Sequence, residues 1–141
     1  MYKVIVAQAK EFKQKGVNLM LAPCMNILRN PLRGRVWEGE DPFLSGEPAT
    51  GTIRGMQSED MIACDKHYVS NAIEDVRHNS SINIPKQVLW EIYLETFYKE
   101  VKKGDVTSIM ESNNTINGTF MIKNKRLLQE ILKDKIGFDV L

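Results

Sequence analysis

The segment CDKHYVSN (64–71) places an acid, a lysine and a histidine directly after a short apolar run, MIAC (61–64). Such side chains can carry charge, move protons or hydrogen-bond a ligand. Polar residues that follow a buried strand lie where ligands bind in α/β proteins, because the carboxyl ends of parallel strands form one rim. Asp65, Lys66 and His67 therefore have two interpretations, either the solvated charges of a turn or part of a site.

Two more sets of polar residues follow other apolar runs. After VNLMLAP come Arg29, Arg33, Arg35, Trp37, Glu38, Glu40 and Asp41, and after VTSIM come Glu111, Ser112, Asn113 and Asn114. If the runs are parallel strands, the three sets converge on one face. Cations, amides and an indole together suit a hydroxyl-rich ligand with an apolar face, which favours a sugar without singling it out. Each set also has an ordinary explanation: an Arg35–Glu38 loop ion pair, a solvated Lys-His turn, and Ser-Asn turns that bond their own backbone.

The elements that must position these residues alternate between helix and strand. We expect helices at 3–15, 44–57, 85–104 and 124–137, strands at 17–23, 61–64, 106–110 and from Phe138, and polar loops at 24–43, 68–85 and 111–119. This alternation predicts βαβ units and a parallel sheet. The apolar runs lack a polar alternation, as is typical of strands covered on both faces. The order, which opens in a helix and closes in a strand, resembles a slice through a larger fold.

Composition limits the classes of partner. The 141 residues carry a net charge of +1, with 43% hydrophobic and 26% charged residues, so nothing favours nucleic acid or an anionic membrane as partner. No run approaches the roughly 18 apolar residues of a membrane span. No signal peptide is visible, and the compartment stays unassigned. Cys24 and Cys64 lie in apolar runs, which favours buried free thiols over a disulfide, and their spacing predicts no metal site. We expect no cofactor.

Four segments, taken in order, resemble the barrel domain of glycoside hydrolase family 3, above all that of fungal and bacterial β-glucosidases. They are KGVNLMLAPCMNILRNPLRGRVWEGEDPFLSGE, RGMQSEDMIACDKHYVSN, EIYLETFYKEVKKGDVTSIMESNNTINGT and LLQEILKDKIGFD. The Lys-His pair, the N-x-x-x-x-P-x-x-G-R segment and the E-D-P-F-L-S-G block are together highly specific. The resemblance implies a partial (β/α)8 TIM-type barrel, with residues 1–141 as a single partial N-terminal domain.

The resemblance also implies the chemistry. In the family, the positions of Arg35, Lys66 and His67 bind hydroxyls of the terminal glucose, and those of Ser112 and Asn114 shape the pocket. The family hydrolyses terminal non-reducing β-D-glucosyl residues with retention, through an aspartate nucleophile and a glutamic acid/base. No position here matches either carboxylate, since the nucleophile belongs to a Ser-Asp-Trp motif beyond the matched segment and the glutamate to a later domain. We therefore expect no catalytic residue and no hydrolysis by this chain alone. Its expected partners are a β-glucoside or glucose and the remainder of the barrel; family members are often secreted.

Some matched positions depart from the family pattern. WEGEDP is two residues shorter than usual, Ala72 stands where glutamate is usual, and Glu111 and Asn113 replace a cysteine and a tyrosine. A carboxylate beside the pocket and a lost aromatic platform should weaken sugar binding. Three alternatives stay open: a non-catalytic sugar-binding or interaction module, a degenerate gene product, and an unrelated α/β enzyme that uses Lys66 or Asp65.

Overall fold

The computed structural model describes residues 1–30, 39–71 and 73–140. In chain order its elements are α1 (Tyr2–Gln14), β1 (Leu19–Met20), α2 (Pro42–Gln57), β2 (Ile62–Tyr68), β3 (Ser81–Ile82), α3 (Lys86–Val88), η1 (Leu89–Tyr93), α4 (Leu94–Lys99), η2 (Glu100–Gly104), β4 (Ser108–Glu111), β5 (Thr115–Ile116), β6 (Thr119–Phe120), η3 (Met121–Lys123) and η4 (Arg126–Lys135). The segments from α3 to η2 follow one another without a break and form one long helix, as the pattern at 85–104 predicts.

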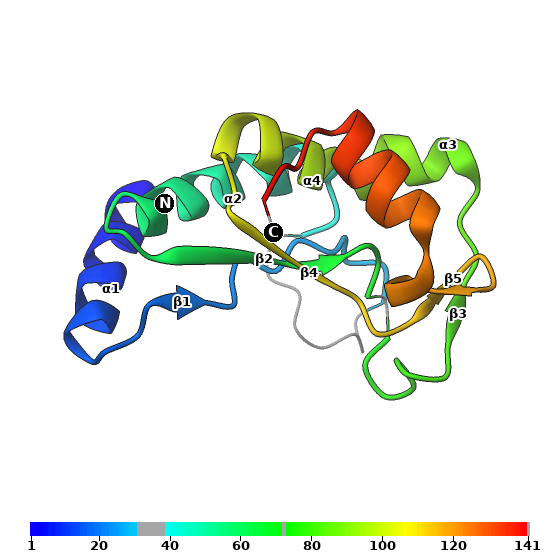
Figure 1. Ribbon diagram of the computed structural model, residues 1–141, viewed down its shortest axis with the longest axis horizontal. Coiled ribbons are helices and arrows are strands. Elements are labelled where there is room, and N and C mark those ends of the chain that lie inside the picture. The colour runs from blue at the N-terminus through cyan, green and yellow to red at the C-terminus, as the bar shows by residue number, and fades with distance from the viewer. Residues whose placement is uncertain (31–38, 72, 141) are drawn as a thin grey trace.

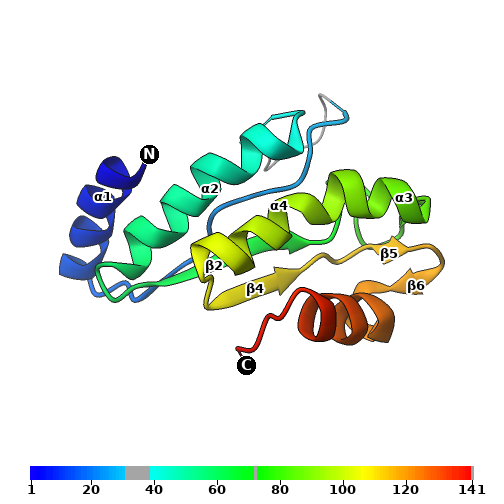
Figure 2. The ribbon, with the colours of Figure 1, turned by 90° about the horizontal axis from the view of Figure 1, so that it is seen from above.

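The main sheet has the order β1-β2-β4, and both strand pairs are parallel. The helices lie on one face of this sheet (Figure 1), and α2 lies between α1 and α4 (Figure 2). Parallel strands joined by helices that cover one face are the arrangement of a β/α barrel segment. The predicted fold class, α/β with parallel strands that alternate with helices, is confirmed.

Helix α2 begins two residues before the predicted start, for a local chemical reason. The side chain of Asp41 accepts a hydrogen bond of 2.6 Å from the backbone N–H of Leu44, so Asp41 is the N-cap. Pro42 occupies the first turn, where its fixed φ suits a helix and its missing N–H costs nothing. Residues 39–41 separate the helix from the segment 31–38, which lies outside the described residues.

The core fills the space between the sheet and the helices. Ile53 and Met56 of α2, Tyr68 of β2 and Phe97 of α4 are fully buried in it. The rings of Tyr68 and Phe97 meet edge to face, with centroids 5.1 Å apart and planes at 87°. Such a pair adds specific geometry to the burial of apolar surface, and it fixes the end of β2 against α4. The predicted burial of Cys24 and Cys64 as free thiols is confirmed.

The prediction of loops at 68–85 and 111–119 is wrong in part, because both segments contribute strands to a second small sheet. Its order is β3-β5-β6, with β3 parallel to β5 and β5 antiparallel to β6. Asn117 and Gly118 join β5 to β6 and both have positive φ, 48° and 80°. Asn-Gly is the dipeptide that this kind of two-residue hairpin turn favours, so the signal was present in TINGTF.

The strand predicted from Phe138 is not formed within residues 138–140. The chain leaves the last helix through Gly137, whose φ is 82°. The N–H of Phe138 then donates to the carbonyl of Leu132 at 3.1 Å, which caps the helix end. The N–H group of Phe138 therefore bonds to the end of the helix and is not available for pairing with a neighbouring strand.

Candidate functional site

Lys66 and His67 lie inside a strand rather than after one. β2 runs from Ile62 to Tyr68 and pairs with β4 over this stretch, so the short strand predicted at 61–64 is corrected. Asp65 is 0% exposed and His67 is 4% exposed, whereas the side chain of Lys66 is partly exposed. The interpretation of Asp65 and His67 as solvated turn charges is therefore wrong.

The backbone of Lys66 is held by the segment that follows β1. The N–H of Lys66 donates to the carbonyl of Pro23 at 3.1 Å, and the N–H of Met25 donates to the carbonyl of Lys66 at 2.7 Å. Cys24 forms the parallel bridge with Lys66 between these two bonds. Lys66 is thus fixed from both sides, by this segment and by β4.

His67 is the extra residue of an irregularity in the pairing of β2 with β4. Lys66 pairs with Met110 and Tyr68 with Glu111, so no residue of β4 stands opposite His67. The peptide bonds Lys66–His67 and Tyr68–Val69 are cis. An extra residue in one strand bends it and redirects a side chain, a device often found beside functional sites.

The side chain of Asn26 makes two hydrogen bonds to the backbone of His67. The side-chain Nδ2 of Asn26 donates to the carbonyl of His67 at 2.7 Å, and the N–H of His67 donates to Oδ1 of Asn26 at 3.2 Å. Asn26 is 3% exposed, so both bonds are shielded from water. Asn26 is not among the site residues predicted from the sequence, where its local signal is one amide inside the apolar run CMNIL (24–28).

Ser112 and Asn114 lie at the end of β4, next to the end of β2. The N–H of Ser112 donates to the carbonyl of Tyr68 at 2.6 Å, and its hydroxyl donates to the carbonyl of Val69 at 3.1 Å. Asn114 is buried, and its Nδ2 donates to the carbonyl of Thr115 at 3.3 Å. The second and third polar sets therefore come together, although their role toward a ligand stays a prediction.

The turn after β2 is held by a short polar chain. Ser70 is fully buried and has a positive φ of 67°, an uncommon backbone conformation for a residue with a side chain. Asn71 donates from Nδ2 to Glu74 at 2.5 Å, and Glu74 pairs with Arg77 at 2.9 Å. These contacts order the segment that directly follows the Lys-His pair.

The first polar set falls largely outside the described residues. Arg33, Arg35, Trp37 and Glu38 lie in the segment 31–38, so the predicted glucose contact of Arg35 and the alternative Arg35–Glu38 ion pair both lie outside the described residues. Of the remaining members, Arg29 and Glu40 are exposed and Asp41 caps α2.

A cavity of about 490 Å³ opens beside Lys66. Its other walls are mainly apolar side chains from α1, α2 and residues 20–24. Neither Ser112 nor Asn114 lines it, so the described residues do not enclose Lys66 and the end of β4 in one pocket.

Tyr68 connects the site strand to the last helix. Its hydroxyl donates to the carbonyl of Leu127 at 2.8 Å, and burial raises the pKa of Tyr68 well above its usual value. The phenol therefore stays neutral beside His67. Within the described ranges, no group of three or more His, Cys, Asp or Glu side chains is arranged to hold a metal ion. No helix in the described part of the chain is long and apolar enough to cross a membrane.

Comparison with known proteins gives one consistent family. The family model described as glycosyl hydrolase family 3 N terminal domain matches residues 1–141. A β-glucosidase of Rhizobium radiobacter is 40% identical over 136 residues, which cover 95% of this chain and 17% of the relative. An exo-α-(1→6)-L-arabinopyranosidase of Bifidobacterium longum is 41% identical over 140 residues, 98% of this chain and 18% of the relative.

Solved structures agree with this. β-Glucosidase 3B from Thermotoga neapolitana, in complex with glucose, matches with a TM-score of 0.94 and 38% identity over 99% of this chain and 20% of that one. The β-glucosidase of Kluyveromyces marxianus, also in complex with glucose, matches with a TM-score of 0.95 and 36% identity over 99% of this chain and 17% of that one. The chain thus spans about a fifth or less of the length of these relatives.

Proposed function

The chain belongs to glycosyl hydrolase family 3, and from this premise we propose that it forms part of the barrel domain of a β-glucosidase. The parent reaction is the retaining hydrolysis of terminal non-reducing β-D-glucosyl residues. Residues 1–141 are one partial N-terminal domain, whose task is to hold the terminal sugar. Because the chain spans only about a fifth of its relatives, the activity is proposed for the larger assembly to which such a domain belongs.

We propose Arg35, Lys66 and His67 as the groups that hydrogen-bond the sugar hydroxyls, with Ser112 and Asn114 shaping the pocket. A cationic side chain and an imidazole donate to hydroxyl oxygens, while an amide can both donate and accept. Such a set orients a neutral polyhydroxylated ring without any need for charge on the ligand.

The observation that carries this proposal is the way Lys66 and His67 are held. Both backbones are fixed at the end of a parallel strand, Lys66 by Pro23 and Met25 and His67 by Asn26. A binding residue must keep its geometry before the ligand arrives, and second contacts of this kind supply that rigidity. A solvated turn would need none of them.

We further propose that the 141-residue chain does not hydrolyse glucosides by itself. Retaining hydrolysis needs a nucleophilic carboxylate and a second carboxylic acid on either side of the scissile bond. By family resemblance, neither position is matched in these residues. Asp139, which precedes the expected position of the nucleophile motif, is exposed and is not proposed as its substitute.

The partner that completes the domain is, in this proposal, the remainder of the barrel. Both outer strands of the main sheet, β1 and β4, have one unpaired edge within the described residues. Leu19 of β1 and Leu21, which directly follows this strand, are 37% and 49% exposed, which is apolar surface that further strands would cover. The isolated chain should therefore self-associate at high concentration, which sedimentation velocity at several concentrations would measure.

The test is a calorimetric titration of the chain with glucose and, separately, with L-arabinose, followed by an assay with p-nitrophenyl β-D-glucoside. L-Arabinose is included because the arabinopyranosidases match as well as the β-glucosidases do. We expect glucose to bind. Lys66→Gln and His67→Gln should each weaken glucose binding about tenfold, because each removes a charged or buried hydrogen bond. We expect no nitrophenol to be released. Lys103→Gln, a substitution of an exposed lysine on η2, is the matched control and should leave binding unchanged.

Two results would count against the proposal in different ways. Binding that is equally strong in the Lys66→Gln and His67→Gln variants would exclude these residues as the sugar ligands. Turnover of the nitrophenyl glucoside by the pure chain would show that the residues here do supply the chemistry.

A non-catalytic sugar-binding module is the second candidate, and one observation favours it. Glu111 stands opposite Tyr68 at the end of the β2–β4 pair, which puts a carboxylate where the resemblance leads one to expect a cysteine. A carboxylate accepts hydrogen bonds from sugar hydroxyls but adds negative charge beside the expected pocket. If Glu111→Cys strengthens glucose binding, this supports the proposal that the chain is part of a β-glucosidase. If Glu111→Cys abolishes glucose binding, this supports the non-catalytic sugar-binding module.

A further inference from the structure

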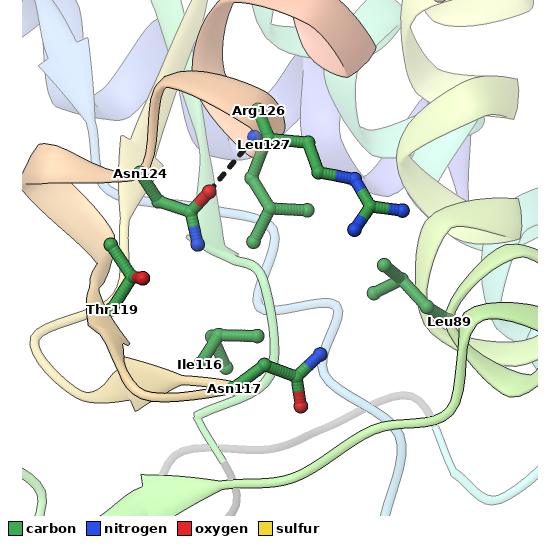
Figure 3. Close-up of a pocket in the computed structure, with 7 residues that line it drawn as sticks. All are labelled: Leu89, Ile116, Asn117, Thr119, Asn124, Arg126 and Leu127. Carbon is green, nitrogen blue, oxygen red and sulfur yellow. Dashed lines mark hydrogen bonds between the residues drawn. The ribbon is translucent and has the colours of Figure 1, made fainter.

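A second cavity, distinct from the one beside Lys66, lies between the β5–β6 hairpin, η1 and the start of η4 (Figure 3). Its volume is about 170 Å³. Leu89, Ile116 and Leu127 form its apolar lining. It shares no lining residue with the cavity beside Lys66.

The polar lining of this cavity is rich in hydrogen-bond donors. It consists of Asn117, Thr119, Asn124 and Arg126. Oδ1 of Asn124 accepts a bond of 3.1 Å from the N–H of Leu127, so the acceptor end of this amide is engaged and its Nδ2 group is available as a donor. The Thr119 hydroxyl adds a further group that can donate.

The side chain of Asn117 lines the cavity but is held in place by two hydrogen bonds to the backbone. Its Oδ1 accepts from the N–H of Ile84 at 2.8 Å, and its Nδ2 donates to the carbonyl of Ile84 at 3.0 Å. These two bonds lock the hairpin turn against the segment before α3. The cavity is therefore shaped by backbone contacts that exist without a ligand.

The charge on the side of the cavity formed by the β5–β6 hairpin and the start of η4 is one-sided. The stretch 117–128 contains Lys123, Lys125 and Arg126 and no acidic residue. Among the residues that the structure describes, Arg126 takes part in no ion pair and no carboxylate lines the cavity. In Figure 3 the side chain of Arg126 extends along the cavity, and its guanidinium lies on the side of Leu89.

We propose that this cavity binds a single oxyanion group, a carboxylate or a phosphate. The planar guanidinium of Arg126 matches both groups with two parallel hydrogen bonds. Asn124 and Thr119 can donate to the lone pairs that these bonds leave free on a carboxylate, or to the further oxygens of a phosphate. The volume of about 170 Å³ is well below the roughly 300–1,000 Å³ of pockets for drug-sized ligands. It therefore suits an end group or a small ion rather than a whole saccharide, and it is independent of the proposed sugar site.

The test is a titration of the ¹⁵N-labelled chain with sodium phosphate and, in a separate series, with sodium acetate, at constant ionic strength set with chloride. We expect saturable shifts of the Asn124 side-chain amide and of the Thr119 backbone amide. Saturation by phosphate alone assigns a phosphoryl group as the natural ligand group, and saturation by acetate alone assigns a carboxylate.

Two variants separate a built site from general attraction by positive charge. Arg126→Gln should weaken binding about tenfold or more, because it removes a charge-assisted pair of hydrogen bonds. Lys125→Gln, the neighbouring exposed cation that does not line the cavity, should change it by less than about twofold because exposed charges are screened. Both side chains are exposed, so the fold should persist, which the remaining amide peaks verify. An absence of saturable shifts with either anion, or equal weakening in both variants, would overturn the proposal.

Discussion

Replacing Gly55 by alanine should destabilise the chain although it improves the helix propensity of α2. A Cβ atom at Gly55 would lie 2.9 Å from Cβ of Ile5 and 3.0 Å from the backbone oxygen of Tyr2, both on α1. Neither atom is the free end of a flexible side chain, so α1 and α2 would have to separate. Overpacking of this kind costs about 1–3 kcal/mol, and the propensity gain returns roughly 1 kcal/mol. The net loss should be about 0–2 kcal/mol, with a central value of about 1 kcal/mol.

Gly51, one turn earlier in the same helix, is the matched control. A Cβ there would meet Met1 and Tyr2 at 3.6 Å, which is ordinary contact, so Gly51→Ala should stabilise by about 0.5–1 kcal/mol. Urea unfolding followed by circular dichroism measures both. With a slope of about 2 kcal/mol per molar urea, the two midpoints should differ by about 1 M, with Gly55→Ala the lower. Equal midpoints would refute the close approach of α1 to α2 at Gly55.

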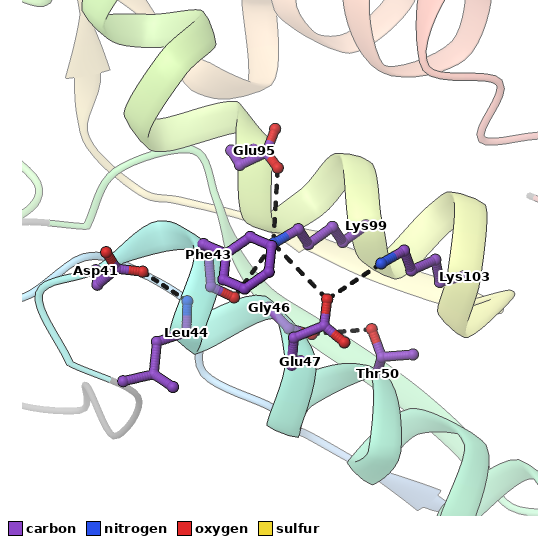
Figure 4. Close-up of polar contacts among 9 residues, drawn as sticks. All are labelled: Asp41, Phe43, Leu44, Gly46, Glu47, Thr50, Glu95, Lys99 and Lys103. Carbon is purple, nitrogen blue, oxygen red and sulfur yellow. Dashed lines mark hydrogen bonds and ion pairs between the residues drawn. The ribbon is translucent and has the colours of Figure 1, made fainter.

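Three further predictions concern polar contacts. Asn26→Ala leaves the buried N–H and C=O of His67 without their partner and should cost about 2–3 kcal/mol; a midpoint like that of the wild type in urea would contradict this. Burial raises the pKa of Tyr68 above its unfolded value of about 10. The contribution of the neutral phenol to the stability of the fold is therefore complete below about pH 10 and is lost as the pH rises further. Tyr68→Phe should accordingly show a shallower alkaline fall in melting temperature than the wild type. The ammonium of Lys99 lies 3.6 Å from the ring centroid of Phe43 and 3.2 Å from the carbonyl oxygen of the same residue (Figure 4). Lys99→Met should therefore lower the free energy of unfolding by about 1–2 kcal/mol, whereas Lys103→Met, which breaks a half-exposed ion pair with Glu47, should lower it by less than about 0.5 kcal/mol. Chemical denaturation that ranks the two variants the other way would exclude the buried role of Lys99.

The helices were predictable because their signals are local. The segment 85–104 combines apolar spacing with Pro85 at its start and a lysine-rich last turn before Gly104, and the structure has one long helix there. The parallel order of the main strands also follows from the alternation of helix and strand patterns, because parallel strands need crossover connections. In both cases the deciding residues lie within one element or its ends.

The length of β2 was not predictable from the strand pattern. Asp65 and His67 are polar residues whose intrinsic propensity does not favour a strand. They are buried in β2 because β4 and the side-chain amide of Asn26, which lie far away in the sequence, supply hydrogen-bond partners for this part of the backbone. Tertiary contacts therefore override the local pattern at the very residues that form the candidate site. A single amide in an apolar run gives no sign of which backbone it will bond.

Contacts between distant helices were also beyond the sequence. Lys99 and Phe43 are 56 positions apart, yet the lysine donates to the carbonyl of Phe43 and covers its ring (Figure 4). In the sequence, Lys99 is one of several lysines at the end of a helix, where a solvated cation is the ordinary expectation. By contrast, the Asn117–Gly118 turn was predictable, since that dipeptide is a strong hairpin signal.

A crystal structure of the chain grown in the presence of glucose would show whether Lys66 and His67 hold a terminal sugar. We expect one glucose at the carboxyl ends of β2 and β4, with its hydroxyls within hydrogen-bond distance of the Lys66 ammonium and the His67 imidazole. Glucose bound elsewhere, with these two side chains in contact only with protein, would contradict it.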